Sequence, residues 1–226
     1  MDGPFPSPPS GVPEYECRPP HCRFFDMGDR ADLTFEGFYD LSLNDMLKRM
    51  SPGEGTSAEE VIRQVHKSLS PLPHGILFTL DYLRSVIEEE GPFDGVIAAS
   101  EGAVAASTLL LYEQQRCKEG DYSPTFKCGI FFVGFPPVKI DGTGLFLSDE
   151  TDERITIPTC HVNGRRDPLW FGSETLWNVC EPSSRTLIMH EEGHIVPQNA
   201  ELVIKILDFL RTIDQIDTQA GKALVV

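Results

Sequence analysis

The sequence has no apolar run that approaches the ~20 residues a membrane-spanning helix needs. Basic residues are also scarce, because 19 Lys and Arg stand against 35 Asp and Glu, for a formal net charge of −16 at pH 7. This excess of acid argues against nucleic acid or an anionic membrane surface as a partner. We therefore expect a protein that binds neither.

The arrangement of the six cysteines predicts neither a metal site nor an exported protein. The closest pair lies in "CRPPHC" at residues 17–22, where prolines crowd the segment and no second Cys/His pair has matching spacing. The sequence also lacks an Asn-x-Ser/Thr acceptor site. We expect a cytoplasmic protein that uses no metal and no other cofactor.

The second half of the chain alternates strand-like apolar runs with helices. Before it, residues 1–23 are too rich in proline and glycine for regular structure, Ser57 and Glu60 form a capping box at the start of one helix, and another helix ends near Gly91. Continuous apolar strands separated by helices predict a parallel sheet covered on both faces, in an α/β fold. The predicted strands are 94–100, 127–135, 155–164 and 185–190, and the predicted helices are 101–115, near 172–180 and 200–213.

The segment "HEEGHIVP", residues 190–197, allows two kinds of chemistry. It contains H-E-x-x-H, which binds zinc when both histidines lie on one continuous helix and a third ligand is present. Here His190 closes a strand-like run, Gly193 interrupts the would-be helix, and Pro197 follows closely. The pattern therefore favours a loop that carries the histidine of a serine hydrolase.

A serine hydrolase also needs a nucleophile, and "AASEG" at residues 98–102 provides a candidate between a predicted strand and a predicted helix. A nucleophilic serine sits in a sharp strand-to-helix turn, which requires small neighbours such as Ala98 and Gly102. The backbone N–H of Glu101, at the start of the helix, would then point to the developing oxyanion. Ser100 is the predicted nucleophile.

The two remaining members of a catalytic triad follow in the chain order Ser, acid, His that α/β-hydrolases use. Asp167 follows the strand that ends at "HVNG", and His194 follows the last predicted strand. Each candidate comes after its own strand, so all three should gather at one rim of the sheet. The rival bases and acids in the chain are His161, His190, Asp141, Asp149 and Asp152.

Four motifs, in the same order along the chain, resemble the fungal serine hydrolase (FSH) family of α/β-hydrolases, which is related to the ovarian-cancer-associated hydrolase. They are "DGPFPSPP" at 2–9, "GPFDGVIAASEGA" at 91–103, "HVNGRRDP" at 161–168 and "HEEGHIVP" at 190–197. The resemblance spans essentially the whole chain.

The resemblance implies an esterase or thioesterase with Ser100 as nucleophile, Asp167 as orienting acid and His194 as base. The substrate would be a small-molecule acyl ester or a carrier-protein-bound thioester, because several family members release acyl chains in fungal polyketide pathways. It also implies one departure. In the family, "DGPF" follows a strand that ends in a His-Gly loop, a helix and a second strand, and this βαβ unit has no counterpart here.

We therefore expect an α/β-hydrolase-like parallel sheet with helices on both faces, lacking the first βαβ unit. Residues 1–216 would form a single domain, with about 10–75 as cap or lid elements and 217–226 as a frayed tail. The missing loop supplies an oxyanion donor in the family, and losing one such donor typically costs ~10²–10³ in rate. Two explanations for the missing unit compete. Either the working enzyme is longer than this sequence, or the chain is a truncated or degenerate member that binds an acyl ligand or a partner without efficient turnover.

An acyl pocket is the last expectation. Its candidate residues are the aromatic side chains of 24–39 together with Leu145, Phe146, Trp170 and Phe171, although core packing is the commoner role of such residues.

Overall fold

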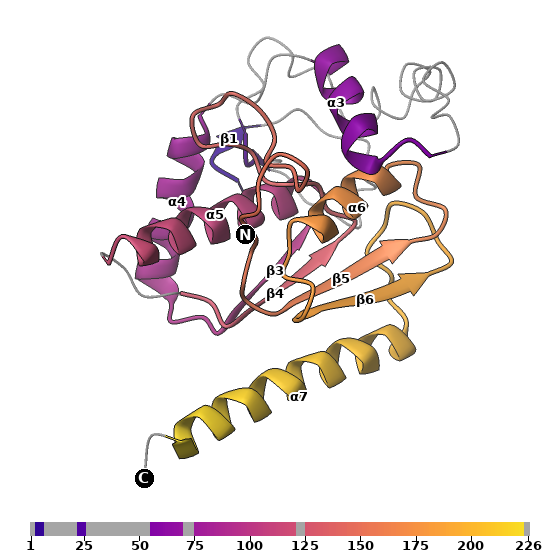
Figure 1. Cartoon of the computed structure of the whole chain (residues 1–226). Helices are drawn as coiled ribbons and strands as arrows, with labels where there is room; N and C mark the ends of the chain where they lie inside the picture. Colours follow the sequence, from indigo (N-terminus) through magenta and orange to yellow (C-terminus); the bar gives the residue numbers. More distant parts are fainter. Residues whose placement is uncertain (1–2, 7–21, 26–54, 70–74, 121–124, 224–226) are drawn as a thin grey trace. The chain divides into compact units, whose positions relative to one another are not determined.

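The computed structural model describes residues 3–6, 22–25, 55–69, 75–120 and 125–223 (Figure 1). The chain divides into two compact units. The first comprises Met1–Glu90 and Lys139–Gly144, and the second comprises Gly91–Val138 and Leu145–Val226. Most of the predicted cap, and the acyl-pocket candidates between 26 and 39, lie outside the described residues.

The first unit contains two predicted helices, α3 (Ala58–Leu69) and α4 (Ile76–Glu90), and a short antiparallel pair formed by β1 (Phe5–Pro6) and β2 (Cys22–Arg23). The capping box is confirmed, because the Glu60 N–H donates to Ser57 Oγ at 3.2 Å.

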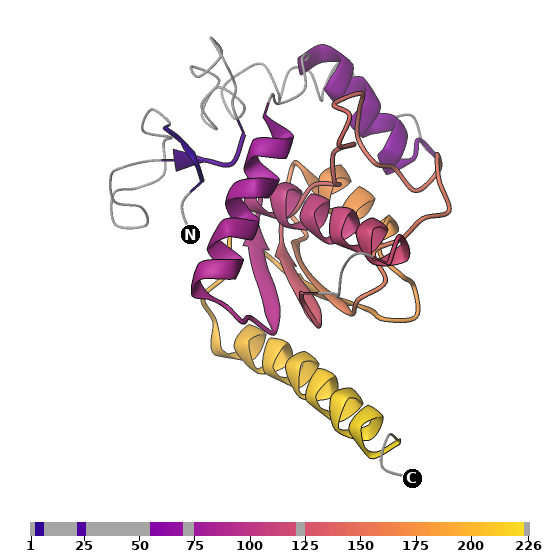
Figure 2. The same ribbon diagram turned by 90° about the vertical axis from the view of Figure 1, so that its left-hand side faces the viewer.

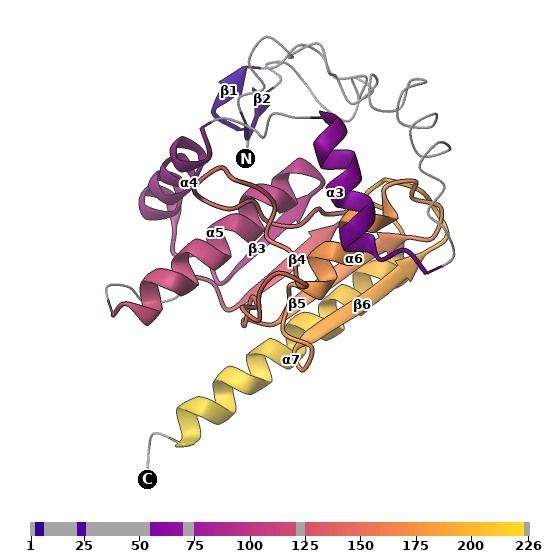
Figure 3. The same cartoon turned by 45° about the horizontal axis from the view of Figure 1, so that its top comes forward.

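The second unit is built on a sheet of four parallel strands in the order β3-β4-β5-β6. Figure 1 shows α5 and α6 on one face of this sheet and α7 on the other, and Figures 2 and 3 show the same layers from two further directions. The predicted α/β architecture is confirmed. The strands are β3 (Gly95–Ala99), β4 (Cys128–Phe132), β5 (Thr159–Gly164) and β6 (Arg185–His190), and the helices are α5 (Glu101–Lys118), α6 (Trp170–Asn178) and α7 (Ala200–Ala223).

Most boundaries lie within three residues of the prediction, and two differ by more. β5 begins at Thr159 rather than at residue 155, because Pro158 has no N–H to donate to a neighbouring strand. Helix α7 continues to Ala223, so it passes the boundary predicted at residue 216.

One part of the core lies between the central strands and α7. All five residues of β4 are buried, and Ile130, Val162 and Ile188 from three adjacent strands form one apolar cluster with Phe209 of α7.

The edge strand β3 is less covered than its neighbours. Ile97 lies in register with Ile130, yet Ile97 is 68% exposed and Ile130 only 1%. Among the described residues, no strand pairs with the outer edge of β3.

Candidate active site

Ser100 occupies a strained turn between β3 and α5. Its backbone has φ 49° and ψ −116°, a left-handed conformation that is rare for a residue with a side chain. The turn is held because the Ser100 N–H donates to Phe132 O at 3.0 Å and the Ala103 N–H donates to Ser100 O at 3.1 Å. The hydroxyl is thereby presented beyond the carboxyl end of β3.

Small residues behind this turn let helix α5 approach the sheet closely. Ala103 is fully buried, and a Cβ added at Gly134, just past β4, would come within 2.9 Å of the Ala103 Cβ and 2.5 Å of a Leu176 methyl. A larger side chain at either position would push α5 away from β4 and carry Ser100 with it.

Asp167 lies in the tight turn after β5, where its N–H donates to Gly164 O at 3.2 Å. One carboxylate oxygen, Oδ1, accepts the Leu169 N–H at 2.8 Å, and the other, Oδ2, lies 2.9 Å from His194 Nδ1. The first bond fixes the carboxylate, so that the second oxygen is aimed at the imidazole.

His194 joins the other two side chains. Its Nε2 lies 3.0 Å from Ser100 Oγ while its Nδ1 faces Asp167. The side chains of His194 and Asp167 are only 4% and 2% exposed. With the buried carboxylate accepting from Nδ1–H, Nε2 is left to accept the proton of the serine hydroxyl.

The loop that carries His194 is fastened to the turn that carries Asp167. The Arg165 N–H donates to His190 O at 2.8 Å, and the Arg166 N–H donates to Glu192 O at 3.1 Å. A Cβ at Gly164 would lie 2.3 Å from Gly193 O, so only glycine permits this contact. The acid and the base are therefore positioned by backbone as well as by their own hydrogen bond.

The rival residues occupy other environments. His161 is buried beneath α6, bonded to Thr159 Oγ1 at 3.0 Å, and burial lowers its pKa to about 3. His190 accepts the Glu192 N–H at Nδ1. Residues 191–195 are bends and not a helix, so His190 and His194 do not have the helical spacing of a zinc motif. The rival acids Asp141, Asp149 and Asp152 are exposed.

Within the described residues no group of three or more His, Cys, Asp or Glu side chains is placed to hold a metal ion. Glu101 is the first residue of α5, directly after Ser100. Its role as an oxyanion donor stays a prediction.

One residue of this region was not among the sequence candidates. Phe135, which follows β4, places its ring centroid 6.3 Å from that of His194. The segment "FFVGF" contained a signal for it, because residues just past the carboxyl ends of parallel strands gather at one rim. Of the proposed acyl-pocket residues, Phe171 is fully buried and belongs to the core, while Trp170 is 41% exposed.

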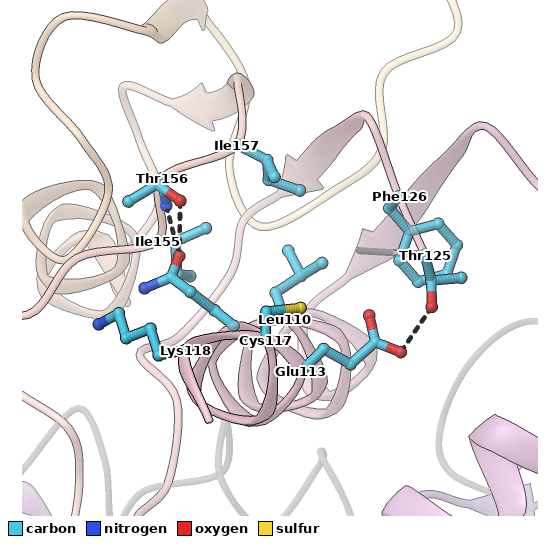
Figure 4. A pocket seen from close by; sticks show the side chains of 10 residues that line it. Leu110, Glu113, Cys117, Lys118, Thr125, Phe126, Ile155, Thr156 and Ile157 are labelled. Atoms are coloured by element: carbon cyan, nitrogen blue, oxygen red, sulfur yellow. Dashed lines mark hydrogen bonds between the residues drawn. The ribbon is translucent and has the colours of Figure 1, made fainter. Parts of the chain in front are cut away.

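A separate pocket of about 330 Å³ lies beside α5, lined by apolar side chains such as Leu110, Phe126 and Ile155 (Figure 4). Phe126 precedes β4 and Ile155 precedes β5, so this pocket is at the amino ends of the strands. Ser100 follows the carboxyl end of β3, at the opposite end of the sheet. The pocket therefore belongs to a different region from the Ser-His-Asp cluster.

A parallel sheet with a serine in a strained strand-to-helix turn, and with an acid and a histidine in later loops of the same sheet, defines the α/β-hydrolase class. Residues 54–206, more than half of the chain, match the family described as "Serine hydrolase (FSH1)". The chain belongs to this serine hydrolase family, as the sequence motifs predicted.

Named relatives agree with this membership. The chain is 34% identical over 157 residues to "Esterase FPY3" of Fusarium mangiferae, covering 66% of this chain and 69% of that protein. It is 33% identical over 131 residues to "Esterase FUS5" of Gibberella moniliformis, covering 57% and 50%. "Family of serine hydrolases 2" of Saccharomyces cerevisiae is 30% identical, with 59% of each chain covered. The chain thus spans between half and about seven tenths of the length of these relatives.

Among solved structures, a CIB-like hydrolase of Thermoplasma acidophilum superposes with a TM-score of 0.44 at 19% identity, over 61% of this chain and 60% of that one. No helix in the described part of the chain is both long and apolar enough to cross a bilayer.

Proposed function

We propose that this protein hydrolyses an ester or thioester through an acyl-serine intermediate, with Ser100 as nucleophile, His194 as general base and Asp167 as the acid that orients the base. The observation that carries the proposal is the unbroken series of contacts at 2.9 Å and 3.0 Å that joins Asp167 Oδ2 to His194 and His194 to Ser100 Oγ. A serine hydroxyl is too weak an acid to attack a carbonyl unaided, and this series removes its proton as it attacks.

In the acylation step, Ser100 Oγ attacks the substrate carbonyl carbon while its proton passes to His194 Nε2. The buried carboxylate of Asp167 stabilises the imidazolium that forms. His194 then donates that proton to the leaving alcohol or thiol as the bond to the carbonyl carbon breaks. The products of this step are the free alcohol or thiol and an acyl-Ser100 ester.

In the deacylation step, a water molecule takes the place of the leaving group. His194 accepts a proton from this water as the oxygen attacks the acyl carbon, and returns the proton to Ser100 Oγ as the acyl bond breaks. The carboxylic acid leaves and the enzyme is regenerated. Each step uses side chains of this chain and water.

Both steps place negative charge on the former carbonyl oxygen. The N–H of Glu101 at the start of α5 supplies one donor to this oxyanion, assisted by the positive end of the helix dipole. We assign no second donor among the described residues.

Two relatives carry the printed name esterase, which supports a small-molecule ester as the substrate class. Release of an acyl or polyketide chain from a carrier-protein thioester, in fungal secondary metabolism, is the narrower version of the proposal. A matched pair of substrates decides between them: butyryl thioester and butyryl oxoester of the same pantetheine-like arm. The narrower version predicts the higher kcat/KM for the thioester after correction for its non-enzymatic rate.

The proposal is tested by turnover of p-nitrophenyl butyrate with wild type and with Ser100→Ala. We expect turnover in the wild type and loss to the background rate in the variant, with unchanged thermal unfolding. A folded wild type that binds the butyryl ester without hydrolysing it would refute the enzyme proposal. It would identify instead a non-catalytic protein for acyl ligands or for a partner.

A further inference from the structure

Phe135 is the aromatic side chain beside the catalytic imidazole. Its ring is tilted by 56° to that of His194 at 6.3 Å between centroids. The residue is half-buried, so part of its surface remains open. It comes from the segment just past β4, between the strands that position Ser100 and Asp167.

The ring is held in place from behind. It packs edge-on against the buried Phe171 at 6.3 Å between centroids. A Cβ at Gly172 of α6 would lie 2.5 Å from a Phe135 ring carbon, so the helix backbone lies directly against the ring. A ring fixed in this way forms a preorganised apolar wall, and a ligand loses little free energy in ordering it.

The chemistry of acyl transfer decides which part of the substrate meets this wall. His194 Nε2 must donate its proton to the leaving oxygen or sulfur, so that atom lies within hydrogen-bond distance of the imidazole when the bond breaks. The acyl chain extends from the same carbonyl carbon in a different direction. A wall beside the imidazole therefore borders the leaving group.

We infer that Phe135 forms the leaving-group subsite and selects esters of apolar alcohols over those with polar or charged leaving groups. This inference rests on the proposed function in its broader form, hydrolysis of a small-molecule ester, and adds a substrate class to it; it argues against the narrower form, in which the pantetheine-like leaving group is polar. A leaving alcohol that extends along the ring buries apolar surface against it during acylation. A methylene that is fully buried is worth about fourfold in affinity, so one covered on a single side should contribute about twofold.

The experiment uses acetate esters of straight-chain primary alcohols, from methyl to hexyl, whose leaving groups have nearly equal basicity. In the wild type, kcat/KM should rise by about twofold for each methylene that reaches the ring. Phe135→Ala should abolish most of this rise. Phe135→Leu, which keeps an apolar side chain, should retain more of it. Phe93→Ala removes an exposed phenyl ring that precedes β3 at the other end of the sheet, and should leave the rise intact.

The deacylation rate distinguishes a leaving-group subsite at Phe135 from a purely structural role of this residue. All acetates form the same acetyl-Ser100, from which the alcohol has already departed. The deacylation rate is measured as the rate at which the acetyl mass disappears from the protein. This rate does not depend on contacts between Phe135 and the leaving group. We expect Phe135→Ala to lower kcat/KM for hexyl acetate at least tenfold more than it lowers this deacylation rate.

Three results would overturn the inference. One is a wild type that hydrolyses methyl and hexyl acetate equally well. Another is a Phe135→Ala variant that keeps the full dependence on alcohol length. The third is an equal loss in acylation and deacylation for every ester, because the ring would then act only by positioning His194. Absence of any turnover or acetyl-enzyme in the wild type would instead remove the proposed function, together with the inference that depends on it.

Discussion

Replacing Gly164 by alanine should disable catalysis without touching any of the three side chains proposed to carry it out. Gly164 ends β5, and the loop that carries His194 crosses directly over it. An added Cβ would lie 2.3 Å from Gly193 O and 2.5 Å from Glu192 O. A carbon and an oxygen that are not bonded need about 3.3 Å. The loop must therefore move by about 1 Å, or the turn that carries Asp167 must move by a similar distance.

A displacement of that size acts on a short chain of contacts. His194 Nε2 is 3.0 Å from Ser100 Oγ, and a shift of about 1 Å takes this contact beyond hydrogen-bond distance. Misplacement on this scale costs about 100-fold in rate. Overpacking should cost about 1–3 kcal/mol of the free energy of unfolding. The loss of kcat/KM should therefore be far larger than the loss that unfolding of part of the protein would cause.

The assay measures kcat/KM for p-nitrophenyl butyrate and urea-induced unfolding on the same preparations. Gly193→Ala is the matched control, because it lies in the same loop, yet the nearest atom to its added Cβ is Arg166 O at 3.6 Å, an ordinary contact. We expect the control to keep its activity within about threefold. A Gly164→Ala protein that is as active as the control would show that this backbone contact does not position the histidine.

Three further results are expected. Asp167→Asn should lower kcat by about 10⁴-fold while the protein stays folded, because the amide favours the wrong imidazole tautomer, and a loss below tenfold would contradict the orienting role. Ile97→Lys should change the unfolding free energy by less than about 0.5 kcal/mol, whereas Ile130→Ala should cost about 2–5 kcal/mol; a large cost at the 68%-exposed Ile97 would mean that the face of β3 that carries Ile97 is covered in solution. Because burial lowers the pKa of His161 to about 3, the unfolded chain binds this proton first as the pH falls. Stability should then decline below about pH 6.5 by up to about 1.4 kcal/mol per unit, and His161→Gln should remove this slope in urea unfolding at several pH values; parallel curves would argue against it.

Local sequence patterns were enough to predict the strands and the turn that holds Ser100. The signals for this turn are an apolar strand, a serine between small residues and a following helix. All of them lie within about twenty consecutive residues, so they can be recognised without knowledge of the rest of the fold. The pairing of Asp167 with His194 was predicted from chain order alone, because parallel strands bring their carboxyl ends to one rim. The structure places the two side chains 2.9 Å apart although 27 residues separate them in the chain.

The contacts that hold the three side chains in place could not be predicted from local sequence patterns or from chain order. Gly164 reads as an ordinary turn glycine, and its role appears only when the loop before His194 lies against it. Phe135 reads as the end of an apolar strand, and its place beside the imidazole depends on the spacing of β4, β5 and α6. Apolar periodicity likewise stops near residue 216, whereas α7 continues to Ala223.

The most direct test of the account is to treat the protein with a fluorophosphonate and determine the intact mass, followed by peptide mapping. The proposed mechanism predicts a single adduct on Ser100, formed at a rate that falls sharply in Asp167→Asn and absent in Ser100→Ala. Folded wild-type protein that gains no adduct, or an adduct that persists after Ser100 is replaced, would contradict it.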